Sequence, residues 1–120
     1  MEPSDESLVL ACRNGDATAW EQLVDRYQGL VFSIARHAGL DQEQSADVFQ
    51  RVFARLVERL GQIEQPALIG AWLATTTRHE AWRFSQRERR NDHAIVQFAR
   101  RHLSGKAVHH GLRFLTVQSK

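Results

Sequence analysis

The segment from Ala71 to Arg90, AWLATTTRHEAWRFSQRERR, contains two tryptophans, one phenylalanine and five arginines, with only two acids, Glu80 and Glu88. Guanidinium groups neutralise phosphates at any point along a strand, and aromatic rings stack on unpaired bases. A core helix keeps rings and avoids arginines, whereas a solvated helix does the reverse. The combination is therefore typical of a surface that binds a polyanion carrying flat rings.

The charge of the chain is divided unevenly along its length. Residues 1–70 hold six Arg and Lys against eleven Asp and Glu, a net charge of −5. Residues 71–120 hold ten against three, a net charge of +7, within a total of +2. A basic part on an otherwise acidic chain suggests a polyanionic partner for that part alone. A solvated face without a partner is the alternative that charge by itself leaves open.

Residue patterns typical of catalysis are not found in the sequence. It has no glycine-rich phosphate loop, nucleophile elbow or HExxH pattern, so we do not expect an enzyme. Only His109 and His110 are adjacent among the six histidines, and the single cysteine, Cys12, is distant in sequence. This spacing does not fit a metal site, and no cofactor is expected. Binding is therefore the expected activity.

Composition is that of an ordinary globular protein, with 42% hydrophobic and 25% charged residues. A length of 120 residues suffices for one modest domain. No run approaches the ~18 apolar residues of a membrane span, and the acidic start, MEPSDESL, does not resemble a signal peptide. Because a lone cysteine forms no internal disulfide, we expect a cytoplasmic protein without a membrane partner.

Helical periodicity continues to residue 90, and we expect an all-α fold, a compact bundle of about four helices. Serine and aspartate favour helix starts and glycine favours helix ends, which sets the expected limits. The expected helices run from Ser4 or Asp5 to Gly15, from Asp16 to Gly39, from Asp41 or Ser45 to Gly61, and from Pro66 or Ala67 to Arg90. The longest connection is the segment 61–70.

The character of the sequence changes after Arg90, so we expect a domain over 1–90 and a tail over 91–120. A short helix is predicted from about His93 to Leu103, followed by a break at Ser104-Gly105. Residues 112–117, LRFLTV, have a strand-like composition without a partner strand. A loosely ordered C-terminal tail is the expected result.

Three- and four-residue spacing separates an apolar from a polar face on each predicted helix. The apolar positions of the second and third helices are Trp20, Leu23, Val24, Tyr27, Val31, Ile34, Ala38, Phe49, Val52, Phe53, Leu56 and Leu60. The polar face of the third helix consists of Asp47, Gln50, Arg51, Arg55 and Glu58. Trp72 is expected on the core side of the fourth helix, whereas Trp82 fits the core and the surface equally well.

Four segments, taken in order, resemble region 2 of the extracytoplasmic-function sigma factors, the small specificity subunits of bacterial RNA polymerase. An acidic start, a Gly-Asp break and an aromatic-bearing helix make up the opening, DESLVLACRNGDATAWEQLVDRYQGLVFSIA. The family's Asp-x-x-Gln-x-x-Phe helix is matched by DQEQSADVFQRVFARL. The linker into Trp-Leu is matched by LGQIEQPALIGAWLATTTR, and the basic promoter-reading segment by RHEAWRFSQRERR. The resemblance covers residues 5–90.

The resemblance implies a sigma factor that binds core RNA polymerase and recognises and melts the minus-ten promoter element. In the family, the third helix docks on the clamp helices of the polymerase's largest subunit. The matching residues here are Asp47, Gln50, Arg51 and Glu58. The family's loop before the fourth helix forms much of the receptor for an extruded base, here roughly Gly61 to Gly70.

The implied DNA contacts fall in that loop and in the basic helix after it. They are Gln62, Ile63, Glu64, Arg78, His79, Trp82, Arg83, Arg87, Arg89 and Arg90. The loop is expected to select the base of the non-template strand, because an extruded base needs a close-fitting receptor. The arginines are expected to hold the strand through its phosphates.

Some positions depart from the family's pattern. His79 replaces a common asparagine, Arg83 stands where an aspartate is frequent, and the residues after Arg90 show no helix-turn-helix pattern of region 4. Two alternatives therefore stay open. One is a region-2-only regulatory protein that binds polymerase or an anti-sigma factor without initiating transcription. The other is an unrelated helical DNA-binding module.

Overall fold

The first three helices each begin after a short polar side chain that accepts a hydrogen bond from the backbone three residues further on. The structure, a computed structural model, describes residues 2–102. Its first helices are α1 (Asp5–Arg13), α2 (Ala17–His37) and α3 (Gln42–Arg59). The caps are Ser4, which accepts from the backbone of Ser7 at 3.1 Å, Asp16, from Ala19 at 3.2 Å, and Asp41, from Gln44 at 2.8 Å.

Asp41, rather than the alternative Ser45, begins α3. The side chain of Gln44 accepts from the backbone N–H of Asp41 at 2.9 Å, which completes a reciprocal capping box. Ser45 is instead fully buried one turn into the helix. Gly15 and Gly39 follow α1 and α2 with φ of 84° and 93°, a conformation that favours glycine and ends a helix. The two predicted helix ends at these glycines are confirmed.

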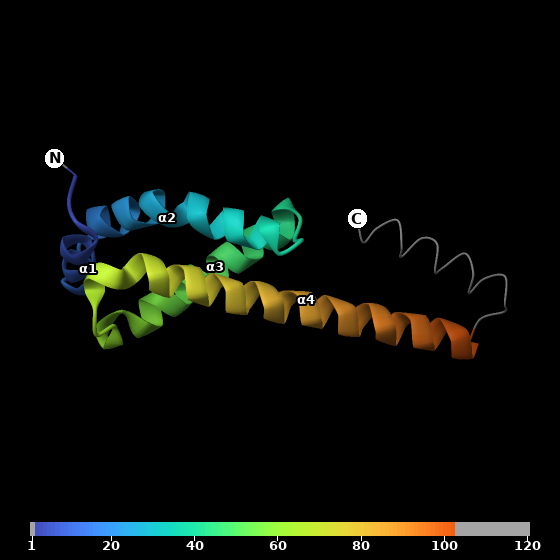
Figure 1. The fold of residues 1–120 in the computed structure, drawn as a ribbon. Helices are drawn as coiled ribbons and strands as arrows, with labels where there is room; N and C mark the ends of the chain where they lie inside the picture. Colours follow the sequence, from blue (N-terminus) through green and yellow to red (C-terminus); the bar gives the residue numbers. More distant parts are fainter. Residues whose placement is uncertain (1, 103–120) are drawn as a thin grey trace. The chain divides into compact units, whose positions relative to one another are not determined.

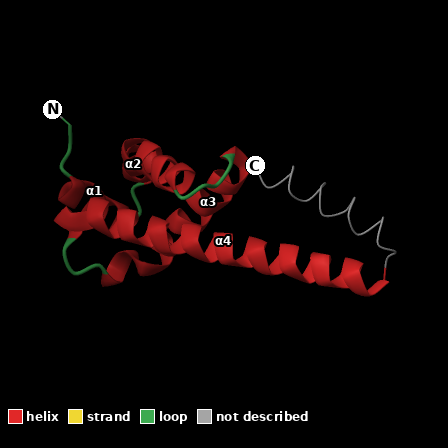
Figure 2. Cartoon of the chain, turned by 45° about the vertical axis from the view of Figure 1, so that its right-hand side comes forward, coloured by secondary structure: helices red, strands yellow, loops and turns green. Residues whose placement is uncertain are grey.

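The connection from α3 to α4 consists of two short 3-10 turns, η1 (Leu60–Gln62) and η2 (Pro66–Leu68). The fourth helix, α4, runs from Ile69 to His102. Pro66 lies at the first position of η2, where its missing N–H costs no hydrogen bond. Figure 2 shows this connection and the other loops between red helices, with no strand among residues 2–102. The predicted all-α bundle of about four helices is confirmed.

One prediction about the end of α4 was wrong. The helix does not stop at Arg90, because α4 continues without interruption to His102. The helix predicted from about His93 is therefore present, as the last part of α4. Asn91 and Asp92 resemble a break in the sequence, but each costs a helix no more than ~0.7 kcal/mol relative to alanine, far less than proline. The predicted break at Ser104-Gly105 and the strand-like segment 112–117 lie outside the described residues.

The chain divides into two compact units, the first ending at Phe84 and the second beginning at Ser85. In the first unit, α1, the start of α2, the two 3-10 turns and the start of α4 lie at one end (Figure 1). In the second unit, the described residues continue α4. Within residues 2–102, no helix is both long enough and apolar enough to cross a membrane.

The core of the first unit is made of apolar side chains from all four helices. Its largest fully buried members are Leu23, Leu56, Ile69, Leu73, Val9, Val31, Val48 and Val52. Trp20, Tyr27 and Trp72 are half-buried and pack against this core, as predicted. Ala38 was predicted to face the core but is exposed after the end of α2, and Ala35 is buried instead. Cys12 is buried too, and this burial raises the pKa of its thiol.

Polar contacts of Asp5 join α1 to α2 beside the start of α4. Asp5 accepts a hydrogen bond from the Tyr27 hydroxyl and a 2.9 Å charged hydrogen bond from Arg26. The Tyr27 ring passes so close to Gly70 that a Cβ there would lie 2.9 Å from the hydroxyl oxygen. Because Asp5 holds the hydroxyl, the ring cannot move aside freely. The close packing of α2 on α4 therefore requires glycine at residue 70.

Substitution of two helical glycines tests this packing. We expect Gly70→Ala to lower the free energy of unfolding by about 1–3 kcal/mol, because the added methyl group overpacks against Tyr27. Gly29→Ala is the matched control, since nothing lies within 4 Å of its Cβ position. That change should raise stability by about 0.5–1 kcal/mol. Urea denaturation of both variants measures the difference, and equal effects would contradict the proposed contact.

The titration of Tyr27 provides a second test. Burial, followed by the hydrogen bond to Asp5, raises the pKa of Tyr27 to about 12. The folded chain therefore keeps its proton where the unfolded phenol, with a pKa of about 10, loses it. Stability should fall as the pH rises from about 10 to 12. Tyr27 is the only tyrosine, so tyrosinate absorbance reports it directly, with the urea-unfolded chain as control. A folded-state midpoint near that of the control would disprove the contact.

Candidate functional site

A pocket of about 540 Å³ lies between the α3–α4 connection and the first turns of α4. Its lining residues are Arg59, Gln62, Ile63, Glu64, Gln65, Leu68, Ala71, Trp72 and Thr75. Gln62, Ile63 and Glu64, the three loop residues predicted from the sequence, all line it. The volume falls within the range of about 300–1,000 Å³ that is usual for small-molecule sites.

The side chains of the pocket supply both apolar contact and hydrogen bonding. Trp72 offers a half-buried ring, and Ile63 and Leu68 add aliphatic surface. The amides of Gln62 and Gln65 each hold donors and acceptors, and the carboxylate of Glu64 accepts. A ring to stack on, with polar groups around it, suits a flat heterocycle whose edge carries donors and acceptors.

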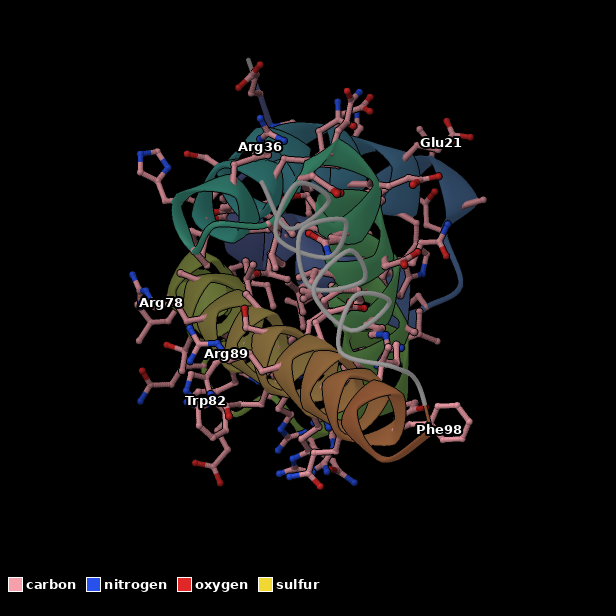
Figure 3. All side chains as sticks on the ribbon, turned by 90° about the vertical axis from the view of Figure 1, so that its right-hand side faces the viewer. Glu21, Arg36, Arg78, Trp82, Arg89 and Phe98 are labelled. Atoms are coloured by element: carbon pink, nitrogen blue, oxygen red, sulfur yellow. The ribbon has the colours of Figure 1, made fainter. Side chains whose placement is uncertain are left out.

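The outer face of α4 carries exposed basic and aromatic side chains. Arg78 and His79 are exposed, and Trp82 keeps 64% of its surface accessible. Figure 3 shows Arg78 and Trp82 projecting away from the bundle on the same side of α4. The sequence left Trp82 undecided between core and surface, and the structure places it on the surface. Trp72, ten positions earlier on α4, is the ring that packs against the core.

The predicted DNA-binding arginines differ in their surroundings. Arg83 has a side chain 54% exposed, and its guanidinium lies 3.7 Å from the carboxylate of Glu80. Part of its charge is therefore already compensated within the fold. Arg87, Arg89 and Arg90 are exposed on the continuation of α4 in the second unit.

Glu80 makes a contact with Arg55 that the sequence analysis did not predict. Its side chain is only 7% exposed, and its carboxylate forms an ion pair with Arg55 on α3, with Nε of Arg55 at 2.8 Å. Arg55, predicted on the solvated face of α3, is thus half-buried in an ion pair. A signal was present, because Glu80 is an isolated acid in a basic segment and precedes Arg83 by three residues.

The polar face of α3 is otherwise exposed, as predicted. Asp47, Gln50 and Glu58 are accessible to solvent, and Val57 beside them keeps 62% of its surface accessible. Arg51 is also exposed, and its guanidinium carbon lies 5.9 Å from the centre of the Phe84 ring. This contact restrains Arg51 while its charge stays accessible. The face therefore combines exposed acid, amide, base and aliphatic groups.

Residues with metal-binding side chains do not gather in the part of the chain that the structure describes. No group of three His, Cys, Asp or Glu residues there could hold a metal ion. His109 and His110 lie outside that part. The features that stand out in residues 2–102 are the pocket, the basic face of α4 and the mixed face of α3.

These features belong to a helical module whose described residues present a pocket, a basic helix face and a mixed polar face. Residues 23–91 match the family model of Sigma-70 region 2. Since the match covers more than half of the chain, the chain belongs to the sigma-70 region 2 family, and its role is a sigma-factor-like role in transcription initiation. Domains of this family interact with core RNA polymerase and promoter DNA. No curated protein and no solved structure matches the chain.

Removal of the Glu80 carboxylate tests the ion pair that joins α3 to α4. We expect Glu80→Gln to lower the free energy of unfolding by about 1–3 kcal/mol, because the 2.8 Å ion pair with Arg55 loses its buried negative partner. Arg83→Gln is the control: it removes only the longer, 3.7 Å contact and should cost less than about 1 kcal/mol. Thermal denaturation compares the two. An equal cost would show that the Arg55 contact contributes nothing.

Proposed function

We propose that this chain is region 2 of a sigma factor of the extracytoplasmic-function group. In this role it binds core RNA polymerase through α3, and the non-template strand of the minus-ten element through α4 and the α3–α4 connection. It would act in the cytoplasm, beside the polymerase, and would need neither a cofactor nor catalysis of its own. The pocket next to the basic face of α4 is the observation that carries this proposal.

The pocket supports recognition of one unpaired base. A single strand that runs along α4 can place a base between the loop and the first turns of the helix. There, Trp72 provides a stacking surface, and Gln62 and Glu64 lie beside the base edge. Extrusion of a base from the duplex costs a few kcal/mol, and a receptor with these groups can offset that cost.

The exposed face of α4 supports sequence-independent binding of the same strand. Arg78 and Trp82 supply a phosphate contact and a stacking platform in the first unit. Arg87, Arg89 and Arg90 add phosphate contacts further along the helix, and His79 a polar contact. Arg83 contributes less in this proposal, because Glu80 already compensates part of its charge. The loop thus selects a base, and α4 holds the strand.

The exposed face of α3 supports docking on polymerase. Asp47, Gln50 and Glu58 make no contact that the fold needs, whereas the opposite face of the helix is buried in the core. Val57, the exposed aliphatic residue on this helix, would be covered by the partner. We assign Asp47, Gln50, Arg51 and Glu58 to the clamp helices of the largest subunit.

Two variants in complexes with core RNA polymerase test the proposal. Asp47→Lys with Gln50→Ala should be retained on polymerase at least about tenfold more weakly, because it reverses a charge at the docking surface. Arg78→Gln with Trp82→Ala should still bind polymerase but bind single-stranded promoter DNA about 1–3 kcal/mol more weakly through the lost stacking. In the Arg78→Gln, Trp82→Ala variant, the log of the affinity should also fall less steeply with log salt, by about 0.7 in the slope.

Matched changes on α2 serve as controls. Asp25→Lys and Arg36→Gln alter exposed residues by the same kinds of charge change and should leave both affinities unaltered. Retention of the docking variant at parental strength would overturn the α3 assignment. Binding to polymerase without transcription from any promoter would favour a regulatory, non-initiating protein. Tight binding to closed duplex, with no preference for single strands, would favour an unrelated DNA-binding module.

A further inference from the structure

We propose that Arg13, at the end of α1, is a positioning residue for base recognition, because its guanidinium holds the backbone of the loop that lines the pocket. The inference rests on the proposed function and adds to it a residue outside the segment 23–91 that matches the family. Arg13 does not line the pocket itself. It would act only through the loop.

The geometry joins distant parts of the chain. Nε of Arg13 donates to the backbone carbonyl of Leu60 at 3.0 Å, and its terminal nitrogen donates to that of Ile63 at 2.6 Å. Leu60 follows the last residue of α3 and begins the 3-10 turn η1. Ile63 lines the pocket, Gln62 lies between the two anchored residues, and Glu64 follows them. One side chain therefore holds the two carbonyls that flank Gln62 and precede Glu64.

Besides Arg13, the η1 turn and the apolar side chains of Leu60 and Ile63 hold the loop. Leu60 is buried and Ile63 is half-buried, but Gly61, Gln62 and Glu64 are exposed. Segments with few buried apolar contacts open easily unless other bonds hold them. Hydrogen bonds from a charged donor are stronger than neutral ones. The planar fork of arginine directs two donors in a fixed relation, which the single ammonium of lysine does not reproduce.

This fixation has a direct consequence for selectivity. A loop held in its binding conformation spends less of the binding free energy on ordering when a base enters. Selection among bases also depends on polar groups at fixed positions, since a displaced group pairs equally poorly with every base. Loss of Arg13 should therefore reduce the discrimination between bases more than it reduces total affinity for the strand.

The fold itself does not depend on Arg13. Leu8, Val9 and Cys12 bury the apolar face of α1, and Asp5 ties its start to α2. Arg13 is exposed, so its replacement leaves no cavity. Arg36 is the matched control, because it too is an exposed arginine in the last turn of its helix. Figure 3 shows Arg36 on the α2 side of the first unit, away from Arg78 and Trp82.

The test compares Arg13→Lys, Arg13→Gln and Arg36→Gln with the parent, each bound to core RNA polymerase. Single-stranded oligonucleotides selected by the parent from a randomised pool identify the position at which base identity affects affinity most. Four oligonucleotides that differ only at that position then give a preference ratio for each variant. Hydrogen exchange of the amides of residues 61–65 reports the order of the loop in the same samples.

We expect the preference ratio of both Arg13 variants to be about tenfold lower than that of the parent. A tenfold decrease corresponds to the loss of one charged hydrogen bond. Polymerase affinity and melting temperature should stay at the values of Arg36→Gln, and the loop amides should exchange faster. If the preference ratio is unchanged and the loop amides exchange as slowly as in the parent, the inference is overturned. The proposed function is not affected by that result. Equal losses of preference, polymerase affinity and stability overturn it in favour of a structural role. A parent without any base preference overturns the proposed base selection and the inference together.

Discussion

The ion pair between Glu80 and Arg55 fixes how α4 lies on α3, and both proposed surfaces depend on it. Among residues 2–84 of the first unit, Glu80 is the only charged residue that is buried. Withdrawal of a carboxylate from water is costly unless opposite charge and hydrogen bonds compensate it. Only one rotation of α4 brings Glu80 to Arg55. That rotation also exposes Arg78 and Trp82 and places Trp72 beside the loop.

The uneven charge of the chain has a structural explanation in the first unit. Three of the six arginines in residues 1–70 bind polar groups of the protein itself: Arg13 binds carbonyls, Arg26 binds Asp5, and Arg55 binds Glu80. Arg78, in the basic half, is exposed on α4. The same residue type therefore has two uses, to hold the fold and to present charge.

Local sequence signals predicted the helices well, because caps and glycine ends act over a few residues. Ser4, Asp16 and Asp41 cap their helices as expected, and Gly15 and Gly39 end them. The end of α4 was not predictable in the same way, since Asn91 and Asp92 weaken a helix without stopping it. The resemblance to a family located the loop at Gln62, Ile63 and Glu64, which do line the pocket.

Contacts between residues far apart in sequence could not be predicted from periodicity. The bond from Arg13 to Leu60 spans 47 residues, and nothing near Arg13 indicates its partner. The pairing of Glu80 with Arg55 was missed for the same reason, because helical spacing assigned Arg55 to solvent. Periodicity reports which face of a helix is apolar. It does not report which polar side chain on the boundary of that face finds a buried partner.

The buried thiol of Cys12 has a consequence of a different kind. Oxidants and alkylating reagents attack the thiolate, and burial in α1 keeps this group protonated and covered. The chain has no other cysteine. Oxidants that act on thiols therefore do not reach Cys12 while α1 stays packed on the core. The same thiol becomes reactive whenever α1 detaches from the core, so the rate of its chemical modification measures how often α1 opens.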